Sequence, residues 1–139
     1  MLRLEQFPGQ TGDIIRFGDL DPQGHVNNTV FATFFETGRV MLLREPSNLL
    51  NPPGATSVLA RLDIGFLREM HWPGEVTIGT ATTRIGRSSY TFLQALFQDG
   101  QCTATADATM VMIDAATRKA RPLPESVIAR LQSLMMREP

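Results

Sequence analysis

Residues 16–44 read RFGDLDPQGHVNNTVFATFFETGRVMLLR, and this stretch decides which fold the chain can adopt. Its early part, Asp21-Pro22-Gln23-Gly24, has turn chemistry, because proline presets one backbone dihedral angle and glycine relaxes another. Asn27-Asn28 then offers side chains that suit a helix N-cap. The residues behind it are apolar at helical spacing: Val30, Phe31, Phe34, Phe35, Val40, Met41, Leu42 and Leu43. We expect one helix from Asn28 to Arg44, stopped before Pro46 and roughly 25 Å long at ~1.5 Å per residue.

The apolar arc of this helix is so wide that the helix should be largely enclosed by other elements. Five segments read as the strands that enclose it: residues 12–20, 58–66, 76–82, 90–97 and 102–114. In the second of these, Val58, Ala60, Leu62, Ile64 and Phe66 alternate with polar or small residues, which predicts one buried face.

Short turns join the strands that follow the helix. His71-Trp72-Pro73-Gly74 turns the chain, and Asp99-Gly100 is a strong hairpin signal. Four strands in hairpin succession indicate an antiparallel sheet. A short last helix begins at Pro122-Leu123-Pro124. The sequence therefore predicts an α+β fold in a single domain, residues 1–139, with about five antiparallel strands wrapped around one long helix and a short C-terminal helix.

Composition narrows the functional classes. The chain has 139 residues, 42% hydrophobic and 19% charged, which suits one globular domain. A net charge of −1 gives no long-range attraction for nucleic acid. Cys102 is the only cysteine, which excludes an intramolecular disulfide and a cysteine-based zinc cluster. Without an apolar signal core or a bilayer-length apolar run, we expect a soluble cytoplasmic protein that binds no membrane.

Asp21 is the candidate for chemistry. A helix N-terminus presents free backbone N–H groups and partial positive charge, which can hold the oxyanion of a tetrahedral intermediate. A carboxylate a few residues upstream could attack the polarised carbonyl or activate a water molecule. The alternative is an aspartate that only caps the turn before Pro22.

The turn and the helix start read Asp19-Leu20-Asp21-Pro22-Gln23-Gly24-His25-Val26-Asn27-Asn28, followed by Phe31, Glu36 and Arg39. This pattern resembles the hotdog-fold thioesterases of the 4-hydroxybenzoyl-CoA thioesterase type, which include the YbgC/FadM-like acyl-CoA thioesterases. Three later segments are also similar to that family: Phe66-Leu67-Arg68, Pro73-Gly74 and 85–89. So are Asp114, Thr117-Arg118 and Leu123-Pro124, so that the resemblance covers nearly the whole chain.

The resemblance implies a hotdog fold with Asp21 as the catalytic carboxylate and the backbone N–H of Asn28 as an oxyanion donor. It also implies a substrate-facing ring at Phe31. The active site would lie between two subunits of a homodimer or of a dimer of dimers.

The other polar residues of the motif could take part in catalysis, as the resemblance implies in a lesser way for Asp19, or could serve local structure. His25 could orient water or the thioester, or it could fix the turn. Asn27 could bind the thioester oxygen or serve as the N-cap, and we favour the cap. For Asp19 we favour a bond to a nearby backbone or basic group. Glu36 and Arg39 are spaced for an ordinary ion pair on the helix.

Coenzyme A carries phosphates, which arginine forks and hydroxyl groups recognise. The resemblance assigns this role to Arg87, Ser88 and Ser89, and the alternative is a solvated turn. No metal site and no redox cofactor is indicated, and coenzyme A would enter only as part of the substrate.

The expected function is therefore hydrolysis of an acyl- or aryl-CoA thioester to free acid and CoA, with an acyl-carrier-protein thioester as another possible substrate. Two alternatives stay open. One is a hotdog module that binds an acyl ligand without turning it over, and the other is a hotdog hydratase or dehydratase acting on acyl thioesters.

Overall fold

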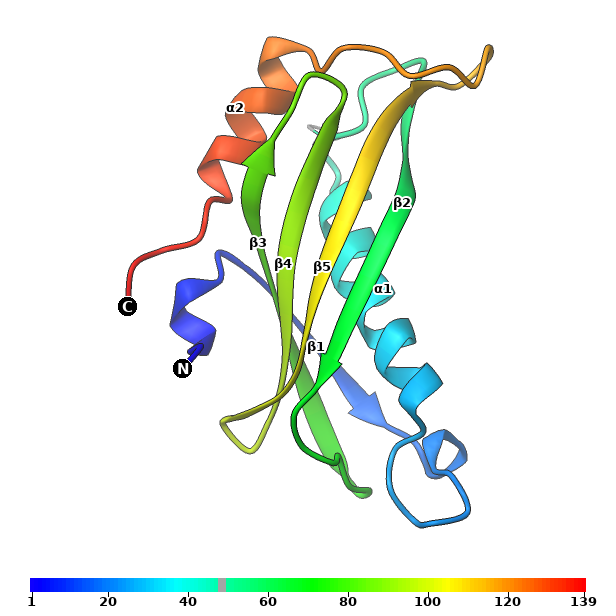
Figure 1. Ribbon diagram of the computed structural model, residues 1–139, viewed down its shortest axis with the longest axis vertical. Coiled ribbons are helices and arrows are strands. Elements are labelled where there is room, and N and C mark those ends of the chain that lie inside the picture. Colours follow the sequence, from blue (N-terminus) through cyan, green and yellow to red (C-terminus); the bar gives the residue numbers. More distant parts are fainter. Residues whose placement is uncertain (48–49) are drawn as a thin grey trace.

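The computed structural model describes residues 1–47 and 50–139 and has one antiparallel sheet with a long helix on one face (Figure 1). The elements in chain order are β1 (Gly9–Ile15), α1 (Asn28–Leu43), β2 (Ala55–Phe66), β3 (Gly74–Ile85), β4 (Ser89–Gln98), β5 (Gln101–Asp114) and α2 (Glu125–Ser133). Short 3-10 helices span Leu4–Gln6 and Phe17–Asp19. The predicted fold class is confirmed. Asn51-Pro52-Pro53-Gly54 predicts a loop over residues 47–57. Residues 48–49 lie outside the described residues, and β2 already begins at Ala55.

The strand order is β1-β3-β4-β5-β2, with every neighbouring pair antiparallel. The expected hairpins between β3, β4 and β5 are present, and Asp99 and Gly100 both have positive φ, as a tight hairpin turn requires. The expected hairpin between β2 and β3 is wrong. After its turn the chain places β3 beside β1, while β2 pairs with β5 at the other edge.

Helix α1 begins at Asn28 as predicted, ends at Leu43, one residue before the predicted end, and packs very closely on the sheet. Gly38 makes this possible, because an added Cβ there would lie 2.5 Å from Ile78 Cγ2 and 2.9 Å from Gln94 Nε2. Gln94 is fully buried and donates to the Phe35 carbonyl, 3.0 Å away. The helix is less enclosed than expected, since Val40 and Met41 remain 43% and 55% exposed.

Among the described residues, two of the three core clusters include residues of α1. The first surrounds the N-terminal half of α1 and contains Phe31, Phe34 and Phe35. The second includes Leu43, at its C-terminal end, together with Val127 and Leu131 of α2. This packing anchors both ends of α1 and fixes the position of its N-terminus.

Two strand predictions were wrong in detail. The first strand ends at Ile15, because the 3-10 turn Phe17–Asp19 follows and Asp19 Oδ2 accepts a hydrogen bond from the Arg16 backbone N–H at 2.8 Å. In β2 a bulge lies between Leu59 and Arg61. The bulge pairs Leu59 with buried Met110, so the buried-face alternation expected from Val58 does not run through the strand.

No helix among the described residues is long and apolar enough to span a membrane.

Candidate active site

The segment between the 3-10 turn Phe17–Asp19 and α1 is a closed loop held by its own backbone. Leu20 and Val26 form an antiparallel bridge. The Asp21 N–H donates to the His25 carbonyl at 2.9 Å, and the Gly24 N–H donates to the Asp21 carbonyl at 3.0 Å. Gly24 has a φ of 91°, a left-handed conformation that glycine adopts without strain. The loop therefore fixes the backbone of Asp21.

The Asp21 carboxylate is also held through its side chain. Its Oδ1 accepts a hydrogen bond from the Gln23 N–H at 2.8 Å, which closes an Asx turn. Its Oδ2 lies 3.6 Å from His25 Nδ1. One oxygen thus has a structural role, and the other faces an imidazole.

The start of α1 is capped by Asn27. Its Oδ1 accepts from the Thr29 N–H at 3.0 Å, and its backbone N–H donates to the Asp19 carbonyl at 2.8 Å. The structure thus supports the cap reading of Asn27. Among the described residues, the backbone N–H of Asn28 has no hydrogen-bond acceptor, while the Val30 N–H donates to the Asn27 carbonyl. One N–H at the positive end of the helix is therefore available.

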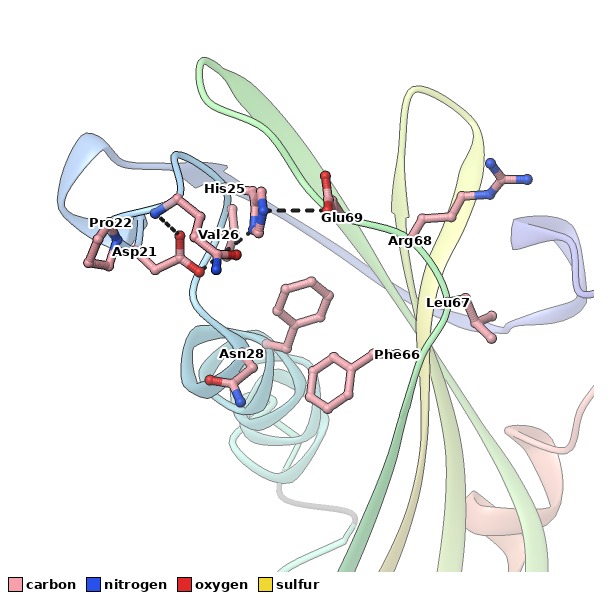
Figure 2. A pocket seen from close by; sticks show the side chains of 11 residues that line it. Asp21, Pro22, His25, Val26, Asn28, Phe66, Leu67, Arg68 and Glu69 are labelled. Carbon is pink, nitrogen blue, oxygen red and sulfur yellow. Dashed lines mark hydrogen bonds and ion pairs between the residues drawn. The ribbon is translucent and has the colours of Figure 1, made fainter.

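A cavity of about 630 Å³ opens between this loop and the segment that follows β2 (Figure 2). Four of the residues singled out in the sequence line it: Asp21, His25, Asn28 and Phe31. The opposite wall consists of residues 66–69. The fold therefore brings the candidate carboxylate, the imidazole and the helix start to one cavity.

The apolar part of the cavity is aromatic. The rings of Phe31 and Phe66 meet edge to face, with centroids 5.2 Å apart. Phe31 is 3% exposed, whereas Phe66 is 52% exposed. The pair forms a wall beside the polar groups, suited to an apolar acyl or aryl group.

His25 lies between two carboxylates. Its Nδ1 is 3.6 Å from Asp21 Oδ2, and its Nε2 is 3.4 Å from Glu69 Oε1. Its ring also stands edge to face with the ring of His71, at 6.5 Å between centroids. The exposed side-chain fraction is 25% for His25 and 61% for Glu69.

The predicted CoA residues lie elsewhere. Arg87, Ser88 and Ser89 form the turn between β3 and β4, which is at the end of the molecule near α2, opposite the Asp21 loop (Figure 1). Their backbone carbonyls accept from Leu123, Met112 and Gly86, respectively. A single chain therefore does not bring this turn to the cavity.

Asp19 and Arg39 both make hydrogen bonds that stabilise the fold. Asp19 bonds the Arg16 backbone, as favoured from the sequence. The expected Glu36–Arg39 pairing is replaced by another contact, because Arg39 is 5% exposed and donates to Gln94 Oε1 at 3.1 Å. Burial lowers the pKa of the Arg39 guanidinium, and the nearby charge of Glu36 opposes that shift.

Cys102 is only partly buried, and its Sγ lies 3.5 Å from the Ala104 carbonyl. Desolvation raises the pKa of this thiol, which disfavours the reactive thiolate. This supports the view that Cys102 is a packing residue.

Sequence reasoning missed the far wall of the cavity. The sequence places Phe66 only at the end of an alternating strand and, with Arg68, in a segment similar to the family, and no pattern points to Glu69. A charged Arg-Glu pair directly after an alternating strand was the one available signal. It could not show that the segment faces His25.

Comparisons with known proteins agree with the observed fold. Residues 15–131 match the family model described as the thioesterase-like superfamily. A thioesterase from Thermus thermophilus, solved in complex with coenzyme A and Zn, is 30% identical over 94% of this chain and 96% of that chain, with a TM-score of 0.81. YbaW, described as a probable thioesterase from Escherichia coli, is 26% identical over 91% of this chain and 98% of that chain, with a TM-score of 0.79.

The PA5185 protein from Pseudomonas aeruginosa has a TM-score of 0.85 at 23% identity, covers 96% of both chains, and shows likeness of fold. Among curated proteins, none matches this chain. Because the family model spans most of the chain and the described architecture is that of its solved relatives, the chain belongs to the thioesterase-like superfamily and has its hotdog fold.

Proposed function

We propose that this protein hydrolyses an acyl- or aryl-CoA thioester to a free acid and CoA, with Asp21 as the catalytic carboxylate. The observation that carries the proposal is the meeting of Asp21, the available Asn28 N–H and an aromatic wall in one cavity. Family membership supports the reaction class.

Asp21 can act in either of two ways. As a nucleophile, its carboxylate oxygen attacks the thioester carbonyl carbon, and the C–S bond breaks with its electron pair passing to sulfur. The CoA thiolate takes up a proton, and water then cleaves the mixed anhydride and restores the carboxylate. As a general base, Asp21 takes a proton from water while the water oxygen attacks, and that proton passes on to the departing thiolate. Both routes use an ionised carboxylate, and Oδ2 is the oxygen not committed to the Asx turn.

Negative charge develops on the carbonyl oxygen in both routes. The Asn28 N–H at the start of α1 is the donor proposed for this oxyanion, assisted by the positive end of the helix. Asn27 contributes indirectly, because its cap bond to Thr29 fixes the first turn. His25 acts beside Asp21 and orients its carboxylate.

The CoA portion would be bound by a second subunit. Coenzyme A is present in the related Thermus thermophilus thioesterase. In this chain Arg87, Ser88 and Ser89 lie at the end opposite the cavity, so an antiparallel homodimer, alone or within a dimer of dimers, would bring them to the partner's site. The long edge strand β2 supports such pairing, because Leu59 and Phe66 on it are 43% and 52% exposed.

The test is thiol release from a panel of acyl-CoAs and acyl-carrier-protein thioesters. We expect wild-type protein to release thiol and Asp21→Asn to lose roughly 10²–10⁴-fold of the rate. Asn at this position keeps the oxygen that accepts from Gln23, so the loop should fold normally. Asp19→Asn is the matched control, since Asp19 bonds the Arg16 backbone and does not line the cavity.

Full activity in Asp21→Asn would refute the mechanism. Ligand binding without thiol release from any thioester would point instead to a non-catalytic binding module. Conversion of an enoyl-CoA without thiol release would point to a hydratase.

A further inference from the structure

The connection between β2 and β3 places the carboxylate of Glu69 beside the His25 imidazole. Glu69 Oε1 lies 3.4 Å from His25 Nε2, on the side of the ring away from Asp21 (Figure 2). Residues on two segments far apart in the sequence thus form a continuous row: Asp21, His25 and Glu69.

The backbone around Glu69 is firmly held. The Arg68 N–H donates to the Thr103 carbonyl at 3.0 Å, and the Met70 carbonyl accepts from the Val26 N–H at 2.9 Å. Met70 is fully buried in the core. After it, the His71 N–H and carbonyl both bond the side-chain amide of Gln98. Glu69 is therefore presented from a rigid segment that is tied directly to the loop bearing His25.

An ionised carboxylate accepts hydrogen bonds and donates none. An imidazole protonated at both nitrogens can direct one N–H toward each of two carboxylates, and the contact at Nε2 then determines how Nδ1 is aimed at Asp21. Asp21 Oδ1 already accepts the hydrogen bond from Gln23, so the orientation of His25 determines how the other carboxylate oxygen, Oδ2, is placed. A side chain that fixes the ring would thereby fix the reactive geometry.

We propose that Glu69 is a positioning residue, which holds the His25 imidazole by its Nε2 so that Nδ1 orients Oδ2 of Asp21. This inference rests on the proposed thioesterase function and adds to it a residue outside the Asp21–Asn28 motif. Glu69 does not react with the thioester, and it acts through His25.

The titratable groups that face the ring are Asp21 from its own loop and Glu69 and His71 from the β2–β3 connection. Arg68 lines the same cavity, but its guanidinium points away from His25 (Figure 2). Of these, Glu69 is the group placed within ion-pair distance of Nε2. His71 meets the ring only edge to face, so it offers no equivalent contact.

The first measurement is a double-mutant cycle on wild-type, Glu69→Ala, His25→Ala and the double variant, with the acyl-CoA that wild-type protein hydrolyses best. Glu69→Ala is expected to lower kcat about ten- to a hundredfold, as for misplacement of a reacting group, with KM changed less than about twofold. In the His25→Ala background the same substitution is expected to change kcat less than about twofold, because two residues acting as one unit are not additive. Glu69→Gln keeps an acceptor oxygen at the same reach and should lose less than Glu69→Ala. Glu75→Ala, an exposed glutamate on β3, is the matched control and should retain wild-type kcat.

The second measurement does not depend on catalysis. Nitrogen-15 NMR of the imidazoles is expected to show a shift of the His25 Nε2 resonance in Glu69→Ala and no comparable shift in Glu75→Ala. Additive losses in the cycle, an unchanged kcat in Glu69→Ala, or an unmoved Nε2 resonance would each overturn the proposal. If wild-type protein released no thiol, the proposed function would fail while the NMR measurement still decided whether Glu69 holds His25.

Discussion

Asp21 shows how one side chain can serve both the loop and the proposed reaction. Its Oδ1 closes the Asx turn with Gln23, and its Oδ2 faces His25. A carboxylate with both oxygens free would lose more rotational entropy when it reached a productive geometry. The turn bond therefore prepares the carboxylate before substrate arrives.

The carboxylate of Asp114, at the end of β5, stabilises the chain turn that follows it, and the pH dependence of protein stability tests this role. Its Oδ1 accepts from the backbone N–H groups of Thr117 and Ala116, each at 2.9 Å, and these bonds lower its pKa from the ordinary value of 3.8. The charge of Arg121 adds a smaller effect in the same direction. Because the pKa is lower in the folded state, the ionised form stabilises the fold above the unfolded pKa, and this stabilisation is lost as the pH falls through the folded pKa.

We expect Asp114→Ala to unfold more readily than wild-type protein at neutral pH, with a difference in unfolding free energy that narrows below about pH 4. Urea unfolding between about pH 7 and about pH 2.5 measures it. Asp107→Ala, at an exposed position on the same strand, provides the control. A difference that widens on acidification would contradict the assignment.

Individual residues show which parts of the site can be predicted from the sequence alone. The Asp21 motif, with its helix start, was recognisable because its members are adjacent along the chain. Glu69 was not, because its contact with His25 depends on Met70 and Val26 holding two separate segments together. The roles of Arg39 and Gln94 were hidden for the same reason, since no local pattern pairs a helix residue with one on a particular strand.

At the scale of elements, α1 depends on its close approach to the sheet. Gly38 faces Ile78 and Gln94 at distances that leave no room for a methyl group. An alanine there would gain helix propensity but would push the helix away from the buried Gln94 bonds.

Gly38→Ala is therefore expected to destabilise the protein by about 1–3 kcal/mol, the usual cost of overpacking a core. Chemical denaturation measures the loss. Gly12→Ala on β1 is the matched control, because nothing lies within 4 Å of its added Cβ, and it should be neutral or raise stability by up to about 1 kcal/mol. Equal stability of the two variants would show that α1 can shift without cost.

Some features of the helices and strands can be predicted from local sequence patterns, and others cannot. The range of α1 was predictable because a wide apolar arc and an asparagine N-cap agree. The bulge in β2 was not, because Leu59 and Ala60 are both apolar and either can face the helix. The placement of β2 beside β5 was equally hidden, since the turn before β3 looks the same whether or not it makes a hairpin.

At the scale of the whole molecule, the proposed CoA residues and the proposed carboxylate lie at opposite ends of one chain (Figure 1). A closed homodimer with twofold symmetry repeats every contact, so the turn of each subunit can serve the cavity of the other. The exposed β2 edge is the surface we propose for this association.

Mixing two defective variants tests this arrangement directly. Asp21→Asn removes the proposed carboxylate and Arg87→Ala removes the proposed CoA contact, so homodimers of either variant should be impaired. In a mixed dimer that shares sites across the interface, one site has both defects and the other has neither. Co-refolding equal amounts should therefore restore about a quarter of wild-type activity, since half of the dimers are mixed and each of these has one intact site. If each subunit used its own Arg87, every site in the mixture would keep one defect, and activity would stay at the average of the two variants. Restored activity would thus establish both the dimer and the exchange of residues across it, which sedimentation alone would not.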